Sequence, residues 1–157
     1  MYPVSIGFDQ ALERIEALLE NGHHAEALVT SIFTFEKLVK RSLRRAVMAR
    51  GFSRQQADTI MGKEGFEKLK NIWPVFERKH RPLPSILGNV WEPIPKAKSM
   101  RNDLVHGNKV YDLDECQNKA KEVLAALRAL HAFIKQDYGS DPWKEQPRPK
   151  TNLQWVV

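Results

Sequence analysis

The sequence predicts an all-α protein, an antiparallel helical bundle of four main helices plus one or two short helices. Apolar residues recur at steps of three and four over long stretches, which is the period of a helix, and no segment keeps the alternation of a strand. Glycine and proline separate these stretches. Because 157 residues suffice for one domain with a hydrophobic core, we expect the bundle over residues 1–139 and an extended, proline-rich tail over 140–157.

Three helices are expected in the first part of the chain. The first covers residues 9–20 and ends at an Asn-Gly pair, which favours a turn. The second is long, covers residues 24–50 and is followed by a glycine that stops it. A short third helix covers residues 53–61, because Ser53 and Gln56 have the spacing of a capping box.

Helical periodicity resumes at Phe66 and continues until Pro74, which we expect to kink or end that helix. Residues 81–95 contain several prolines and are expected to form a loop around one short turn at 85–90. A helix then begins at Pro93 and Pro95 and ends at His106, with Gly107 as its stop; proline suits a first turn and glycine suits the position after a last one. The last long helix opens with a capping box at residues 112–115, and a glycine closes it at 139.

Composition limits the classes of partner. No apolar run reaches the length of a membrane span, and no basic segment precedes an apolar stretch at the N-terminus, so we expect no membrane association. The single cysteine, Cys116, excludes an intrachain disulfide and is typical of a reducing compartment, which favours a cytoplasmic location. The formal charge of +6 favours an anionic partner, but charge alone does not distinguish RNA, DNA, a nucleotide or an acidic protein.

The segment Arg101-Asn102-Asp103-Leu104-Val105-His106-Gly107 is the main candidate for a functional site. It places a permanent cation, an amide and a titratable imidazole in the closing turns of a predicted helix. Asn102 and His106 are four residues apart, so they share a face and are able to hydrogen-bond. Arg101 lies about 140° around the helix from His106, within reach of its long side chain. We expect Arg101 and His106 both to face solvent.

These groups are the ones needed to cleave RNA without a metal. The base is His106, which takes the proton of a 2′-hydroxyl, while the guanidinium of Arg101 stabilises charge on the phosphate. An Arg-x4-His spacing alone is common, so the longer string carries the prediction. On the residues alone, an alternative stays open: Arg and His in a last turn complement the helix dipole, and Gly107 is an ordinary C-cap.

The helical bundle together with Arg101, Asn102 and His106 resembles the HEPN superfamily. The resemblance implies a metal-independent endoribonuclease that leaves a 2′,3′-cyclic phosphate and a 5′-hydroxyl, in a toxin, defence or RNA-processing role. It also implies a homodimer with a composite site and, for a toxin, an antitoxin or inhibitor protein as partner. Members paired with a nucleotidyltransferase carry Tyr two positions after the His; Asn108 stands here and the next Tyr is Tyr111, which argues against that pairing. A HEPN module without catalysis, which binds RNA, a nucleotide or a partner protein, is the alternative.

Basic residues near the motif are candidates for contacts with an RNA backbone. Lys98 and Lys109 flank it, and the second helix carries a basic cluster at helical spacing: Lys40, Arg41, Arg44 and Arg45. We predict substrate contacts at Lys98, Lys109, Lys40 and Arg44, although a solvated helix face explains the cluster equally well. Glu36 is the acid nearest to the apolar stripe of that helix; it either supports Arg101 from the neighbouring helix or forms a surface ion pair.

Other chemistries have weaker support in the sequence. Glu77 and His80 have the i, i+3 spacing of a di-iron bundle, but the second such pair spans a predicted break, so neither a metal nor another cofactor is expected. Residues 53–69 resemble a helix-turn-helix, which keeps DNA binding as an alternative. Trp143 and Trp155 are expected to hold the tail against the bundle or against a partner.

Overall fold

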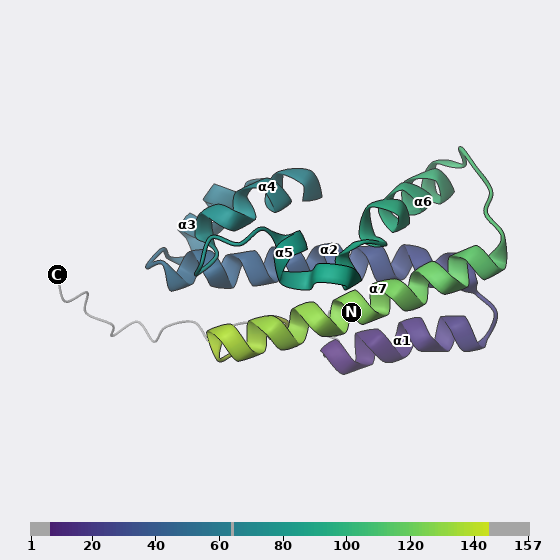
Figure 1. Ribbon diagram of the computed structural model, residues 1–157, viewed down its shortest axis with the longest axis horizontal. Helices are drawn as coiled ribbons and strands as arrows, with labels where there is room; N and C mark the ends of the chain where they lie inside the picture. The colour runs from purple at the N-terminus through teal and green to yellow at the C-terminus, as the bar shows by residue number, and fades with distance from the viewer. Residues whose placement is uncertain (1–6, 64, 145–157) are drawn as a thin grey trace, which may run out of the picture.

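The computed structural model describes residues 7–63 and 65–144, and every regular element in these residues is helical. The elements in chain order are α1 Phe8–Glu20, α2 His24–Ala49, α3 Arg54–Met61, α4 Phe66–Phe76, α5 Leu83–Leu87, the 3₁₀ turn η1 Gly88–Trp91, α6 Ile94–His106 and α7 Leu113–Tyr138. The predicted all-α class is therefore confirmed. In Figure 1, α2 and α7 lie along the middle of the molecule, with α1 on one side and α3, α4 and α6 on the other.

The helices form where the apolar spacing predicts them. In α1 the buried residues Phe8, Leu12 and Ile15 form one stripe, and the chain turns back at Gly22 with a left-handed φ of 79°. Only glycine adopts that conformation without steric cost. The 26 residues of α2 bury a continuous stripe that runs through the centre of the core. The hairpin of α1 and α2 is antiparallel, as its short turn requires.

The two longest helices, α2 and α7, run parallel to each other (Figure 1). At one end, Nδ1 of His24 hydrogen-bonds to the carbonyl oxygen of Leu113 at 3.1 Å, so the two first turns are neighbours. At the other end, Arg45 donates to the hydroxyl of Ser140 at 3.1 Å, beyond the last turn of α7. The antiparallel order expected for neighbouring helices holds in the hairpins but not for this pair. The reason is the connection: α3, α4, α5, η1 and α6 lie between α2 and α7, and they return the chain to the starting end.

Local signals for the short elements are partly confirmed. The capping box is present, since the hydroxyl of Ser53 accepts from the backbone N–H of Gln56 at 3.1 Å and the Gln56 side chain accepts in return. By contrast, Pro74 does not end α4, which continues to Phe76. Of the two helices that resemble a helix-turn-helix, α4 turns its apolar residues Phe66, Leu69 and Trp73 into the core.

Two expectations for the later segments are corrected. Residues 81–95 are mostly helical, because Pro82 and Pro84 stand at the N-cap and in the first turn of α5, where a missing N–H costs nothing. Asp112 is the N-cap residue of α7, but its side chain makes no capping hydrogen bond. Asp114 and Glu115 still lie in the first turn, where negative charge favours the helix dipole.

The compact part of the chain extends past the end of α7. Trp143 is 7% exposed and packs edge-on against Phe8, with 5.7 Å between ring centroids. Arg41 donates to the carbonyl oxygen of Trp143 at 2.5 Å. The expected role of Trp143 in holding the chain to the bundle is therefore correct, and residues 140–144 belong to the body rather than to an extended tail. Trp155 and the rest of the predicted tail lie outside the described residues. Over the described ranges, no helix is both long and apolar enough to cross a membrane.

Candidate functional site

The candidate motif lies in α6, which is held by one buried stripe. Ile94, Ala97 and Met100 are buried, and Leu104 is partly buried against the core. Arg101 is buried with them, because it stands four residues after Ala97 and seven after Ile94 and so falls on the same stripe. A guanidinium on a core-facing stripe needs a polar partner within the protein.

That partner is Glu36 of α2. One carboxylate oxygen of Glu36 accepts from Nη2 of Arg101 at 2.7 Å, and the other accepts from Nη1 at 3.4 Å. The carbonyl oxygen of the Asn102 side chain accepts from Nε at 2.8 Å. One face of the guanidinium lies over the ring of Phe33, with 4.8 Å from Cζ to the ring centroid. These contacts hold the guanidinium in one position, and they assign Glu36 to Arg101 rather than to a surface ion pair.

The expectation that Arg101 faces solvent is wrong. The residue is 8% exposed, because the carboxylate of Glu36 and the ring of Phe33 cover it. Asn102 orients Arg101 through its own side-chain oxygen, instead of bonding to His106 as its spacing also allowed. The sequence contained one signal for this burial: Arg101 continues the 94, 97 stripe.

By contrast, His106 is exposed, at the last position of α6. The next residue, Gly107, is the C-cap with φ 67° and ψ 20°, and its N–H donates to the carbonyl oxygen of Asp103. A Cβ at this glycine would meet no atom within 4 Å, so its backbone conformation is the reason for glycine here. The chain leaves the helix directly after the imidazole, which stays open to solvent.

The loop between α6 and α7 is fastened to α6 through Tyr111. Its hydroxyl donates to a carboxylate oxygen of Asp103 at 2.6 Å, and this hydrogen bond raises the pKa of Tyr111 to about 12. The ammonium groups of Lys96 and Lys109 lie 5.6 Å and 5.1 Å from the centroid of the Tyr111 ring. Thus Lys109, a predicted substrate contact, lies on the loop that follows His106.

Lys98 has a packing role in the structure. Its ammonium group pairs with Glu67 of α4 at 3.2 Å and lies 4.3 Å from the centroid of the Phe66 ring. These contacts join α6 to α4. The structure therefore does not bring Lys98 to the group of Arg101, Asn102 and Glu36, although the sequence places it three residues before Arg101.

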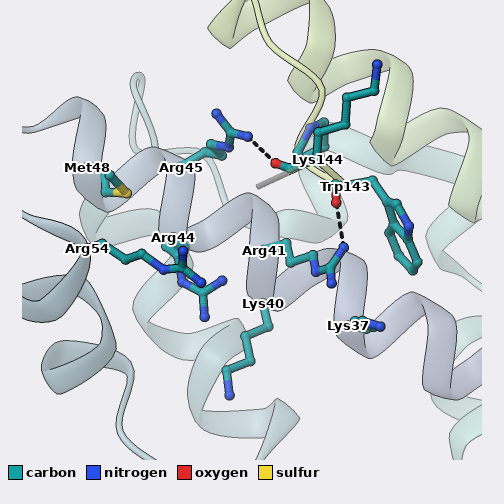
Figure 2. A pocket seen from close by; sticks show the side chains of 10 residues that line it. Lys37, Lys40, Arg41, Arg44, Arg45, Met48, Arg54, Trp143 and Lys144 are labelled. Carbon is teal, nitrogen blue, oxygen red and sulfur yellow. Dashed lines mark hydrogen bonds between the residues drawn. The ribbon is translucent and has the colours of Figure 1, made fainter. Parts of the chain in front are cut away.

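The basic cluster of α2 lines a pocket of about 370 Å³ beside the turn that follows α7 (Figure 2). Lys40 is exposed at this pocket, and Arg44 pairs with Asp58 of α3 at 2.9 Å. Arg45 is 8% exposed and donates to main-chain carbonyl oxygens of Asp141 and Lys144, so a solvated face does not describe it. Lys37, Arg54 and the turn also line the pocket, and none of them was predicted from the sequence. The i, i+3 spacing of Lys37 and Lys40 was the available signal.

The side chains of Glu77 and His80 make hydrogen bonds within the protein. The carboxylate of Glu77 is fully buried and accepts from backbone and side-chain N–H groups of Arg81, while Nδ1 of His80 hydrogen-bonds to the carbonyl oxygen of Pro74. In the part of the chain that the structure describes, no cluster of three or more His, Cys, Asp or Glu has the arrangement of a metal site.

Comparison of the chain with protein-family models, with curated proteins and with solved structures finds no match. The functional interpretation therefore depends on the residues and their geometry.

Proposed function

We propose that this protein is a metal-independent endoribonuclease with Arg101 and His106 as its catalytic residues and Asn102 as the residue that orients Arg101. One observation carries the proposal: a guanidinium fixed by Glu36 and Asn102 belongs to the same short helix as an exposed, helix-terminal imidazole. The resemblance to the HEPN superfamily, on the same residues, supports the same activity.

The proposed chemistry follows from the two groups. The neutral imidazole of His106 removes the proton of a 2′-hydroxyl, whose oxygen then attacks the adjacent phosphorus. The bond to the 5′-oxygen breaks, and the products are a 2′,3′-cyclic phosphate and a 5′-hydroxyl. Arg101 keeps N–H groups on its terminal nitrogens beyond those that Glu36 takes, and these stabilise the charge on the phosphate oxygens.

A homodimer is part of the proposal. Along α6, Arg101 and His106 are about 7.5 Å apart in helix rise and about 140° apart in rotation, so two copies of the motif in one cleft would bring more groups to one phosphate than a single copy. Apolar side chains beside the motif favour such contact: Phe33 and Val105 are each 53% exposed. We expect sedimentation to give a dimer at about micromolar concentration, with the interface disrupted by Phe33→Glu. A strictly monomeric wild-type protein would contradict the composite site.

The test of activity uses a structured RNA pool in excess EDTA. The wild-type protein is expected to cleave it and leave cyclic-phosphate ends, whereas His106→Ala is inactive. Because His106 is exposed, its replacement is expected to change the free energy of unfolding by less than about 0.5 kcal/mol. His23→Ala, at another exposed helix end, is the matched control and keeps the activity. Cleavage that survives in His106→Ala would reject the assignment of the base.

One observation favours a second candidate, a module that binds RNA, a nucleotide or a partner protein without catalysis. Glu36 neutralises the charge of Arg101, which weakens its attraction for a phosphate. The same assay separates the two candidates, because a binding module retains RNA on the protein without producing cyclic-phosphate ends.

A further inference from the structure

A concentration of positive charge lies outside the group of Arg101 and His106, in the pocket between α2, α3 and the turn after α7. Seven of its ten lining residues are Lys or Arg, and none is Asp or Glu: Lys37, Lys40, Arg41, Arg44, Arg45, Met48, Arg54, Pro142, Trp143 and Lys144. Figure 2 shows that these cations come mostly from α2, with Arg54 contributed by α3 and Lys144 by the turn. A concave surface of one charge sign raises the local concentration of counter-ions of the other sign.

Hydrogen bonds fix the positions of the arginine side chains at the inner wall of the pocket. Arg41 donates to the carbonyl oxygen of Trp143, and Arg45 donates to those of Asp141 and Lys144 and to the hydroxyl of Ser140. These acceptors are neutral, so they position the guanidinium groups without cancelling their charge. Arg44 pairs with the carboxylate of Asp58 at 2.9 Å, which fixes its guanidinium at the side of α3. The floor of the pocket is thus preorganised.

The cations also repel one another. Partial burial lowers the pKa of Lys37 below its ordinary value, and the charge of Arg41 lowers it further. Burial lowers the pKa of Arg45 as well, with Arg44 adding to the effect and the carboxylate of Asp141 opposing it. The charged forms of Lys37 and Arg45 are thus partly desolvated and lie beside other cations, and a bound anion would stabilise both charges.

Size and position indicate the kind of anion. A volume of about 370 Å³ is within the range of small-ligand pockets and accommodates successive phosphate groups. The ring of Trp143 lies close to Lys37 and Arg41, at 5.2 Å from Nζ and 4.7 Å from Cζ to its centroid, so cations stand beside this aromatic ring as well. The cationic lining therefore suits the pocket to phosphate groups.

The pocket also lies in line with the candidate site. On α2, Lys40 follows Glu36 by four residues, so it lies one turn further along the side of the helix that holds Arg101, about 6 Å along the helix axis. A strand whose scissile phosphate is at Arg101 would therefore reach the pocket at Lys40, which is part of its lining.

We propose that the pocket between α2, α3 and the Pro142–Lys144 turn binds successive phosphate groups of a polyanion, with Lys37 and Lys40 at its rim and Arg41 and Arg45 at its floor. The proposal deepens the proposed function, and rests on it only for RNA as the source of the phosphates. The alternative source with the same chemistry is a free polyphosphate, such as the phosphate chain of a nucleotide.

The experiment measures fluorescence anisotropy of a labelled 2′-O-methyl RNA oligonucleotide with the full chain. This probe lacks the attacking hydroxyl, so binding is measured independently of cleavage. The double variant Lys37→Ala/Lys40→Ala is expected to bind about tenfold more weakly, and its affinity is expected to depend less on salt, by about 0.7 in the logarithmic slope for each lost contact. The matched control Lys121→Ala/Lys135→Ala removes two exposed charges from α7 and is expected to bind like the wild-type protein.

Competition with inorganic triphosphate at constant ionic strength identifies the source. If triphosphate displaces the probe from the wild-type protein, and does so about tenfold less well from the double variant, the site takes a free polyphosphate as well as RNA. If it does not displace the probe, the site binds the RNA backbone. Equal affinities of the double variant and its control would overturn the proposal, whether or not the wild-type protein cleaves RNA. His106→Ala retains binding under the proposal, so a failure of catalysis and a failure of this pocket are distinguished.

Discussion

At the scale of single residues, Arg101 is the residue whose environment differs most from what its type suggests. A guanidinium on a buried stripe is stable only because Glu36, Asn102 and Phe33 surround it. The same contacts make it rigid, which is what a residue that stabilises a reacting phosphate requires. Loss of activity in Arg101→Ala would therefore combine a lost catalytic group with a lost core contact, whereas the exposed His106 reports on chemistry alone.

This coupling between Glu36 and Arg101 gives a prediction. Glu36→Ala is expected to lower the free energy of unfolding by about 1–3 kcal/mol, because it leaves a largely buried guanidinium without its charged partner. Arg101→Ala is expected to cost a similar amount, and the double variant less than the sum, with a coupling energy of about 1–2 kcal/mol. Urea unfolding of the four proteins measures this cycle.

The control for the cycle is the pair of Lys119 and Glu122 on α7, which has a similar bond length of 3.0 Å but a more exposed carboxylate. Glu122→Ala is expected to change stability by less than about 0.5 kcal/mol. If the coupling energy of Glu36 and Arg101 is also below about 0.5 kcal/mol, then solvent, and not Glu36, compensates the charge of the Arg101 guanidinium.

At the scale of helices, the sequence predicts what is decided locally. The bounds of α1, α2, α6 and α7 agree with the predicted ranges to within a few residues, because a glycine just after the last turn of each determines where the helix stops. Where a local rule has two outcomes, the prediction was less accurate. A proline ends a helix or starts one, and the structure uses Pro84 in a first turn and keeps Pro74 inside α4.

The relations between helices depend on the whole chain, and the sequence did not predict them. Periodicity shows which face of α2 and of α7 is buried, but it contains no information on their relative direction, which follows from the path of the intervening residues. The same limit applies to the basic residues. Sequence spacing grouped Lys98 with Arg101, yet the fold directs Lys98 to Glu67 and brings Lys144, distant in the chain, to Arg45.

At the scale of the whole molecule, one residue with a buried carboxylate, Glu77, lies where the ends of several helices meet. Glu77 follows α4, and its carboxylate accepts from the backbone N–H groups of Lys79 and Arg81 at 2.9 Å and 2.7 Å and from the Arg81 guanidinium at 2.7 Å. The same guanidinium reaches Asp137 of α7 at 3.0 Å. Arg50, just after α2, donates to the carbonyl oxygen of Glu77 at 2.8 Å. The Glu77 carboxylate thus links the end of α4 to α7 through Arg81, while the main-chain carbonyl of the same residue links it to the end of α2.

The junction gives a pH dependence of stability. Burial alone would raise the pKa of Glu77, but the hydrogen bonds from the side chain and backbone of Arg81 and from the backbone of Lys79 outweigh it, so the folded pKa lies below the ordinary value of 4.5. A carboxyl whose pKa is lowered by folding contributes stability that is complete above its unfolded pKa and is lost as the pH falls through its folded pKa. The wild-type protein is therefore expected to lose stability as the pH is lowered below about 5.

Glu77→Gln is expected to be less stable at neutral pH and to lose less stability on acidification, because its amide does not titrate. Urea midpoints from about pH 6 to about pH 3 measure both slopes, with the exposed Glu13→Gln as a control that keeps the wild-type dependence. Parallel curves for Glu77→Gln and the wild-type protein would show that the acid sensitivity arises at another carboxyl, for example that of Asp141. Burial alone would raise the pKa of Asp141, but hydrogen bonds from the backbone of Trp143 and from His131 outweigh that effect and lower it.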